Sequence, residues 1–393
     1  MRDIFNNHSS AFGHLTTKEL KKLVRLFRLL SNPRISKLGI QLMKRFGNIQ
    51  LPGLQHFQRW LFRPFYAGTT LKESKFTVAS LSKYGVHSYL NYAIEDSSTE
   101  SEFDTNCEMV KKLITHAAKT SDIPFCVCKP TSFGHKHLFQ KINAKQSLNT
   151  EQQIAWKRII NRFRSCCQIA KDYDVGLLID AEEYNMQIAV DQLVLELMRE
   201  FNTSKAVVHN TVQLYLVDGN HRLQQMHKLA IKKDFFLGLK LVRGAYMEKE
   251  RKIAHKHGLS SPICASKAET DKSFNAAMHY CIKHLVNIAV VLGSHNEESM
   301  IQAINLMNQY EIKPNDDRIW FSQLLGMSDY ITFTLANEGY NVVKFVPFGP
   351  MDKLIPYFAR RAEENTAIAG QTTRELMRLQ KELKRRATLA NER

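Results

Sequence analysis

The chain of 393 residues is 44% hydrophobic, which is enough to form one large domain or two ordinary ones. Its net charge of +17 favours anionic partners such as an acidic membrane surface or a phosphorylated cofactor. Because no RNA-recognition, helix-turn-helix or zinc-finger pattern accompanies this charge, we expect no nucleic-acid partner.

The seven cysteines are an odd number, and their spacing matches no zinc knuckle. We therefore expect reduced thiols and no metal site. No apolar run approaches the ~18 residues that a membrane-spanning helix requires.

Residues 1–85 have the pattern of helices, with loops around Pro33 and Pro52. Within them, residues 20–30 predict an amphipathic basic helix, which either packs on the protein body or touches a membrane surface. Packing on the body is the default expectation for such a helix.

From residue 86 the pattern changes to short apolar runs that alternate with longer helical segments. The predicted strands are residues 86–93, 125–129, 175–179, 207–216, 237–242, 286–292, 319–325 and 341–346. The predicted helices include residues 150–171, 185–200, 265–285, 297–310 and 328–338. This alternation predicts a (β/α)₈ barrel, which typically needs about 250 residues. An open doubly wound sheet is the alternative, and the absence of a G-x-G-x-x-G sequence counts against it.

The predicted fold class is therefore α/β, a TIM-like barrel with an N-terminal helical extension. We expect three parts: the helical extension at residues 1–85, the barrel at residues 86–372, and a basic C-terminal helix or tail at residues 373–393.

Functional residues of such barrels follow the carboxyl ends of the strands. The candidates at these ends are Lys129, Asp180, Gln213, Tyr215, Lys240, Arg243, Ser294, His295, Asn296, Gln323 and Phe345. Lys129 and Asp180 each follow an apolar strand directly, so we expect their charges in the barrel mouth. An ion pair across the rim would be a purely structural role for both.

Past the last strand, residues 357–365 predict a helix that carries Tyr357, Arg360, Arg361 and Glu364 on adjacent faces. Two guanidinium groups beside an aromatic ring suit a small substrate with a carboxylate. A solvated basic face is the alternative interpretation of this helix.

Two hypotheses account for these cations. In the first, Lys129 or Lys240 forms a Schiff base in an aldolase-type barrel, and Asp180 moves protons. In the second, all the cations bind ligands: Lys129 and the two arginines hold a carboxylate, while Lys240 and its neighbours hold a phosphorylated cofactor. The second explains the number of permanent cations better.

Seven segments, at residues 125–131, 178–183, 210–215, 238–246, 293–297, 323–327 and 356–365, together resemble the proline dehydrogenase family of the single-function eukaryotic type. The most specific are Lys-Leu-Val-Arg-Gly-Ala-Tyr at residues 240–246 and Tyr-x-x-Arg-Arg-x-x-Glu-Asn at residues 357–365. The resemblance implies a distorted (β/α)₈ barrel with non-covalent FAD. It also implies oxidation of L-proline to 1-pyrroline-5-carboxylate, a ubiquinone-type acceptor, and peripheral membrane contact on the matrix side of the mitochondrial inner membrane.

The resemblance also implies a role for each matching residue. Lys129, Arg360 and Arg361 would hold the substrate carboxylate, while Tyr357 and Leu324 would wall the substrate ring. Tyr246 would pack near the flavin, and Lys240 would reach toward its N5 edge. The other flavin-holding and network positions would be Asp180, Gln213, Arg243, Gly244, Ala245, His295, Asn296 and Glu364.

Phe345 departs from the family pattern, in which this position is usually Tyr in proline-oxidising members and Ser in the hydroxyproline-oxidising branch. A bulky apolar side chain would leave a substrate hydroxyl without a hydrogen bond. We therefore expect L-proline to be preferred, with 4-hydroxyproline as the alternative substrate.

Overall fold

The computed structural model describes residues 4–6, 11–30, 62–93, 97–351, 353–354, 357–358 and 371–391. Eight parallel strands follow one another in sequence order and close into a barrel, in which β8 pairs with β1. The strands are β1 (His87–Tyr92), β2 (Phe125–Cys128), β3 (Gly176–Ile179), β4 (Val208–Gln213), β5 (Leu237–Val242), β6 (Ile288–Gly293), β7 (Ile319–Leu324) and β8 (Val342–Phe348). The closed barrel confirms the predicted fold class.

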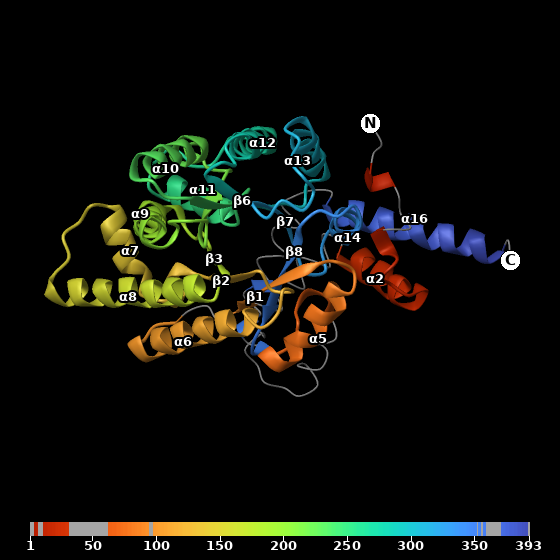
Figure 1. The fold of residues 1–393 in the computed structure, drawn as a ribbon, viewed down its shortest axis with the longest axis horizontal. Coiled ribbons are helices and arrows are strands. Elements are labelled where there is room, and N and C mark those ends of the chain that lie inside the picture. Colours follow the sequence, from red (N-terminus) through yellow and green to blue (C-terminus); the bar gives the residue numbers. More distant parts are fainter. Residues whose placement is uncertain are drawn as a thin grey trace.

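Helices surround the barrel and connect its strands (Figure 1). Those within the strand–helix alternation are α6 (Glu100–Ala117), α7 (Lys136–Asn143), α8 (Thr150–Asp172), α9 (Tyr184–Phe201), α10 (Gly219–Lys233), α11 (Met247–Lys256), α12 (Lys267–Lys283), α13 (Glu297–Gln309) and α14 (Asp329–Asn337). The remaining elements are the short helices η1 (Ile4–Asn6), η2 (Arg63–Phe65) and η3 (Pro130–Ser132), and the helices α2 (Thr17–Leu30), α5 (Leu71–Ser82) and α16 (Gln371–Asn391). The division at residues 85 and 372 stays a prediction.

Capping residues fix where two of the outer helices begin. Thr99 caps α6 in a reciprocal box with Glu102, and Asn149 caps α8 in the same way with Gln152. Each box satisfies backbone N–H groups that the first helical turn leaves without partners.

Side chains alternate between the inside and the outside of the barrel, as the pleat of a strand requires. On β8, Val343 and Phe345 join a cluster in the interior that includes Tyr89 and Leu178. Lys344, between them, contacts α14 on the outside. Five strands begin later than predicted: β1, β3, β4 and β8 by one residue, and β6, which starts at Ile288, by two.

Two helices from opposite ends of the sequence, α2 and α16, lie side by side at one side of the barrel (Figure 1). The apolar side chains Leu20, Val24 and Phe27 of α2 are buried, which confirms that this helix packs on the protein body. Its basic residues, such as Lys21 and Arg25, face solvent. Among the described residues, no helix has the length and apolarity to cross a bilayer. The predicted loops at Pro33 and Pro52 lie outside the described residues.

His14 connects this terminal region to α14, since its ring stacks on Phe333 with 3.5 Å between centroids. Burial lowers the pKa of His14 to about 4 from its ordinary value of 6.5. A lowered pKa in the folded state gives stability that is complete above pH ~6.5 and is lost as the pH falls toward 4. Because of His14 alone, the free energy of unfolding should be about 2 kcal/mol lower at pH 5 than at pH 7.

We therefore expect His14→Phe, which cannot be protonated, to lose less stability than the wild type between pH 7 and pH 5. Urea unfolding at both pH values measures the difference. His257→Gln, a change at an exposed histidine of the same chain, is the matched control. Equal acid sensitivity of His14→Phe and wild type would contradict the prediction.

Candidate active site

Lys240 occupies the middle of the barrel mouth. Its ammonium donates a hydrogen bond of 2.7 Å to Oδ1 of Asp180, which follows β3. The same nitrogen lies 5.3 Å from the ring centre of Tyr89 and 5.7 Å from that of Phe345, within the range of cation–π attraction. Residues of β1, β3, β5 and β8 thus converge on one buried positive charge.

The surroundings of Lys240 keep it protonated. Burial alone disfavours the ammonium, but the Asp180 carboxylate and the Tyr89 hydroxyl outweigh burial and raise the pKa of Lys240 above its ordinary value. A lysine that forms a Schiff base must instead lose its proton near neutral pH. The arrangement therefore counts against the aldolase hypothesis for Lys240 and favours a binding or electrostatic role.

Aromatic rings line the wall beside Lys240. The ring centroids of Tyr89 and Phe345 are 5.3 Å apart. Phe345 also stacks on Tyr357, with 5.9 Å between ring centroids and 29° between ring planes. The Tyr89 hydroxyl shares a hydrogen bond of 2.8 Å with Oγ of Ser322. Leu324 packs against the same cluster. The wall suits the apolar part of a small ligand.

Tyr89 and Ser322 were not among the candidates from the sequence. Ser322 lies two residues before Leu324, the last residue of β7, and so shares its inward face. Tyr89 lies three residues before Tyr92, the last residue of β1, on the face opposite to that of its neighbour Leu90. Following the alternation of faces back from each strand end would have pointed to both.

A second group of polar side chains surrounds Arg243, directly after β5. Its guanidinium donates to Oδ1 of Asp271 at 2.7 Å, to Oγ of Ser294 at 2.7 Å and to Oγ of Ser299 at 2.9 Å. Asn296 caps α13 by accepting from the backbone N–H of Ser299. Arg243 is thus fixed in place at the edge of the mouth, and the helix N-terminus beside it favours negative charge.

The third group lies where β2, β3 and β4 end. Gln213 donates to the backbone oxygen of Glu182 at 2.8 Å. The carboxylate of Glu182 accepts from both the backbone N–H and the hydroxyl of Thr131. Thr131 lies two residues after Lys129, so this corner holds the segment that carries the lysine. A cavity of about 20 Å³, the size of a single water site, is lined in part by Lys129 and Asn91.

The segment that links β5 to α11 needs a glycine. Gly244 has a φ of +127°, and a Cβ there would meet the Tyr215 ring at 2.4 Å. Ala245 follows, and Tyr246 occupies the N-cap position of α11 without a capping hydrogen bond from its side chain. Only a glycine lets the backbone adopt this turn so close to an aromatic ring.

Two strand-end candidates, Gln323 and His295, form hydrogen bonds with residues in or at the start of α14. Gln323 was expected in the mouth, but it accepts a hydrogen bond from Thr332 of α14 and donates to the Ser294 backbone, so it links outer elements. His295 shares a hydrogen bond of 3.0 Å with Ser328, at the start of α14. For Gln323 the sequence interpretation was wrong, because it did not apply the alternation of faces along β7.

Arg360, Arg361 and Glu364 lie outside the described residues. Tyr357 and Phe358 are helical and buried, at the start of the predicted helix. The roles given to all these residues stay predictions.

Behind the mouth, Lys344 is entirely buried on the outer face of β8. Its ammonium donates to Oδ1 of Asp329 at 2.8 Å and to the backbone oxygens of Met327 and Leu324 at 2.6 and 3.2 Å. It therefore holds the segment after β7, which carries Leu324, against β8. No sequence pattern pointed to this lysine, which lies between two apolar strand residues.

Comparison with known proteins identifies the family. The proline dehydrogenase family model matches residues 75–374. The carbapenem antibiotics biosynthesis protein CarD of Pectobacterium carotovorum subsp. carotovorum is 37% identical over 323 residues, which cover 82% of this chain and 83% of that protein. The mitochondrial proline dehydrogenase 1 of Dictyostelium discoideum is 31% identical over 369 residues, which cover 83% of this chain and 64% of that protein.

The fold also matches a solved structure. Proline utilization A of Bdellovibrio bacteriovorus, inactivated by N-propargylglycine, superposes with a TM-score of 0.77 at 18% identity over 94% of this chain and 42% of that chain. The chain thus spans less than two thirds of that protein and of the Dictyostelium relative. With a family match over more than half its length, the chain belongs to the proline dehydrogenase family.

Proposed function

We propose that this protein oxidises L-proline to 1-pyrroline-5-carboxylate with a non-covalently held FAD. The observation that carries the proposal is Lys240, which Asp180 keeps positive in an aromatic-walled barrel mouth. Electrons then pass to a ubiquinone-type acceptor. FAD, when bound, supplies the two-electron acceptor for the substrate.

The donors of the mouth fit such a cofactor. Arg243 supplies a fixed positive charge, Gln213 an amide, and the N-terminus of α13 a partial positive charge for phosphate. The hydroxyl of buried Thr211, next to Lys240 in the sheet register, has no hydrogen-bond partner among the described residues. This unused polar group supports a site that a polar ligand completes. Lys240, Arg243, Gln213, His295 and Asn296, with the backbone at Gly244 and Ala245, would hold the cofactor.

The protein's own groups then have distinct tasks. Lys129, Arg360 and Arg361 hold the substrate carboxylate, and Tyr357, Leu324 and Phe345 enclose its ring. Tyr246 packs beside the cofactor. Asp180 and Glu364 orient the cations. Precise placement of this kind lowers the barrier because the reacting atoms meet already aligned.

A visible spectrum of the purified chain tests the proposal. Oxidised flavin absorbs roughly at 370 and 450 nm, and anaerobic L-proline should bleach the longer-wavelength band. Protein that lacks these bands even after FAD is supplied would refute the proposal. Borohydride trapping of a substrate on Lys129 or Lys240 would favour the aldolase alternative instead.

Arg360→Met and Arg361→Met should each raise KM for L-proline roughly 10- to 100-fold, because a charged contact to a carboxylate contributes about 1.5–3 kcal/mol. Flavin content should stay at the wild-type level, since neither arginine is assigned to the cofactor. Steady-state kinetics together with the flavin-to-protein absorbance ratio measure both quantities. Arg374→Met, at an exposed arginine of α16, is the control. Wild-type KM in both variants would restore the solvated-face interpretation of that helix.

Phe345 should set the preference for L-proline over trans-4-hydroxy-L-proline. Its ring contacts Tyr89 and Tyr357, so it is part of the wall. Phe345→Ser should raise the ratio of kcat/KM for hydroxyproline to that for proline roughly 10-fold, since the new hydroxyl can pair with that of the substrate. Phe345→Leu removes the ring without adding a hydroxyl and should not. A wild-type enzyme that prefers hydroxyproline would overturn the assignment.

We further propose a mitochondrial location with peripheral contact at the matrix side of the inner membrane. The mitochondrial names of several relatives support the compartment. Because the apolar face of α2 is buried, the contact would be electrostatic, through the basic residues that α2 exposes. Salt-sensitive binding of the full chain to cardiolipin-containing vesicles tests this contact.

A further inference from the structure

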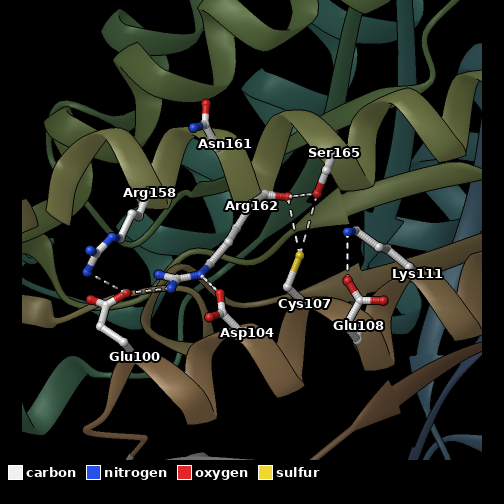
Figure 2. A pocket seen from close by; sticks show the side chains of 9 residues that line it. All are labelled: Glu100, Asp104, Cys107, Glu108, Lys111, Arg158, Asn161, Arg162 and Ser165. Carbon is white, nitrogen blue, oxygen red and sulfur yellow. Dashed lines mark hydrogen bonds and ion pairs between the residues drawn. The ribbon is translucent and has the colours of Figure 1, made fainter. Parts of the chain in front are cut away.

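On the outside of the barrel, helices α6 and α8 enclose a surface cavity of about 610 Å³ (Figure 2). Its lining residues are Glu100, Asp104, Cys107, Glu108, Lys111, Arg158, Asn161, Arg162 and Ser165. Figure 2 shows the sulfur of Cys107 pointing from α6 toward α8, next to Ser165 and the backbone oxygen of Arg162. Cys107 is the cysteine of this lining, so a small solute in the cavity can reach it.

A second thiol lies directly behind the first. The sulfur atoms of Cys107 and Cys166 are 3.7 Å apart, which is van der Waals contact. Both cysteines are buried, at 3% and 0% exposure, and they come from different helices. A disulfide needs a separation of ~2.05 Å, so a closure of under ~2 Å would join α6 to α8.

The two thiols differ in their surroundings. Hydrogen bonds from Cys166 and Ser165, with Lys111 nearby, lower the pKa of the Cys107 thiol, although burial opposes them. The hydrogen bond to Cys107 and burial raise the pKa of Cys166 well above its ordinary range. The thiolate is the reactive form of cysteine, so Cys107 is the attacking group and Cys166 the group that completes the bond.

We propose that Cys107 and Cys166 are a reversible redox pair, which hydrogen peroxide converts to a disulfide between α6 and α8. The Cys107 thiolate attacks one peroxide oxygen and the O–O bond breaks, which leaves a sulfenic acid and, with the thiol proton, one water. The Cys166 sulfur then attacks the sulfenic sulfur, and the second oxygen leaves as water with the Cys166 proton. Two thiols and one peroxide thus give one disulfide and two waters.

The disulfide would act on the segment after Lys129. Asn106, the neighbour of Cys107, donates to the backbone oxygen of Ser132 at 3.0 Å. Arg162, one turn before Cys166, donates to the backbone oxygen of Phe133 at 3.0 Å. Bringing the two sulfur atoms together would shift Asn106 and Arg162, and with them the backbone segment that accepts their hydrogen bonds. This consequence rests on the proposed function, in which Lys129 holds the substrate carboxylate; the disulfide itself does not.

The first test uses the full chain and does not depend on activity. After treatment with hydrogen peroxide under native conditions, the intact mass should fall by two hydrogen atoms, and digestion should yield one peptide pair linked through Cys107 and Cys166. Dithiothreitol should reverse both changes. A native protein that keeps all thiols free, forms a different disulfide, or carries only sulfinic or sulfonic acid at Cys107 would overturn the proposal.

Serine variants show which thiols form the disulfide. Cys107→Ser and Cys166→Ser should each abolish the linked peptide, and Cys264→Ser, which changes a buried thiol elsewhere in the fold, should leave it intact. If a serine variant fails to fold, differential alkylation of the wild type reports the same pair, because only Cys107 and Cys166 should lose reactivity after peroxide and regain it with dithiothreitol.

The second test measures kinetics before and after oxidation. KM for L-proline should rise at least about threefold in the oxidised enzyme and return with dithiothreitol, while flavin content stays constant. Cys166→Ser should show no such change. A disulfide that forms with KM unchanged would refute the coupling to Lys129, whereas a protein without proline oxidation would refute the proposed function and leave the mass result standing.

Discussion

Replacing Lys240 by methionine should slow the reduction of bound flavin by L-proline at least ~10²-fold, because one preorganised positive group beside developing charge is worth this much in other enzymes. The ammonium lies between Asp180 and two aromatic rings, so water cannot readily take its place. Binding of L-proline should change far less, since its carboxylate is assigned to other cations. Anaerobic stopped-flow absorbance near ~450 nm, the flavin band, separates the two quantities.

Removing this lysine also leaves the carboxylate of Asp180 without its partner, which could disturb the mouth by itself. The double variant Lys240→Met with Asp180→Asn removes that charge, and its slow reduction should persist. Lys252→Met, at an exposed position of α11, is the control. Unchanged reduction kinetics in Lys240→Met would show that the lysine is only a structural partner of Asp180.

Lys344→Met should destabilise the chain by ~3–5 kcal/mol, because it leaves the buried carboxylate of Asp329 without its counter-charge. Lys344 also satisfies the backbone oxygens of Leu324 and Met327, which the methionine cannot do. Burial and the nearby Asp329 raise the pKa of Glu375 in α16 to about 8, so this group is largely protonated at pH 7 and the charge that Lys344 compensates is that of Asp329. Urea unfolding of the full chain at pH 7 measures this effect.

The double variant Lys344→Met with Asp329→Asn should recover part of that stability, because it removes the uncompensated charge. Lys313→Met, at an exposed position before β7, should leave the unfolding free energy within about 0.5 kcal/mol of the wild type. If Lys344→Met behaved like Lys313→Met, the buried network of Lys344 would not be a source of stability.

The strands could be predicted because each is a short apolar run, and both faces of a barrel strand are covered. Even so, three boundaries were misjudged by two residues or more. Residues 214–216 continue an apolar pattern after β4 but lie outside the strand, β6 begins at Ile288 and not at residue 286, and β8 extends to Phe348 and not to residue 346. Apolar character alone therefore does not mark where a strand begins or ends.

The site was predicted in part for the same reason. A charge directly after an apolar strand was expected to face the mouth, and Lys129 and Asp180 were selected for this reason. Lys240, which lies inside β5, was selected as a polar residue near a strand end. The partners of these charges could not be read from the strand pattern. Asp180 pairs with Lys240 from β5, two strands away from β3, and not with a residue of an adjacent strand.

The sequence by itself determined the order and kind of the elements, the closed barrel they form, and the set of cations at its strand ends. These follow from local periodicity and from the cost of burying a charge, both of which act over a few residues. Only the tertiary structure decided that Tyr89 lies beside Lys240 and bonds to Ser322, that Lys344 faces outward to Asp329, and that Cys107 meets Cys166. Such pairs join residues far apart in the chain, and closure of the barrel and packing of helices bring them together.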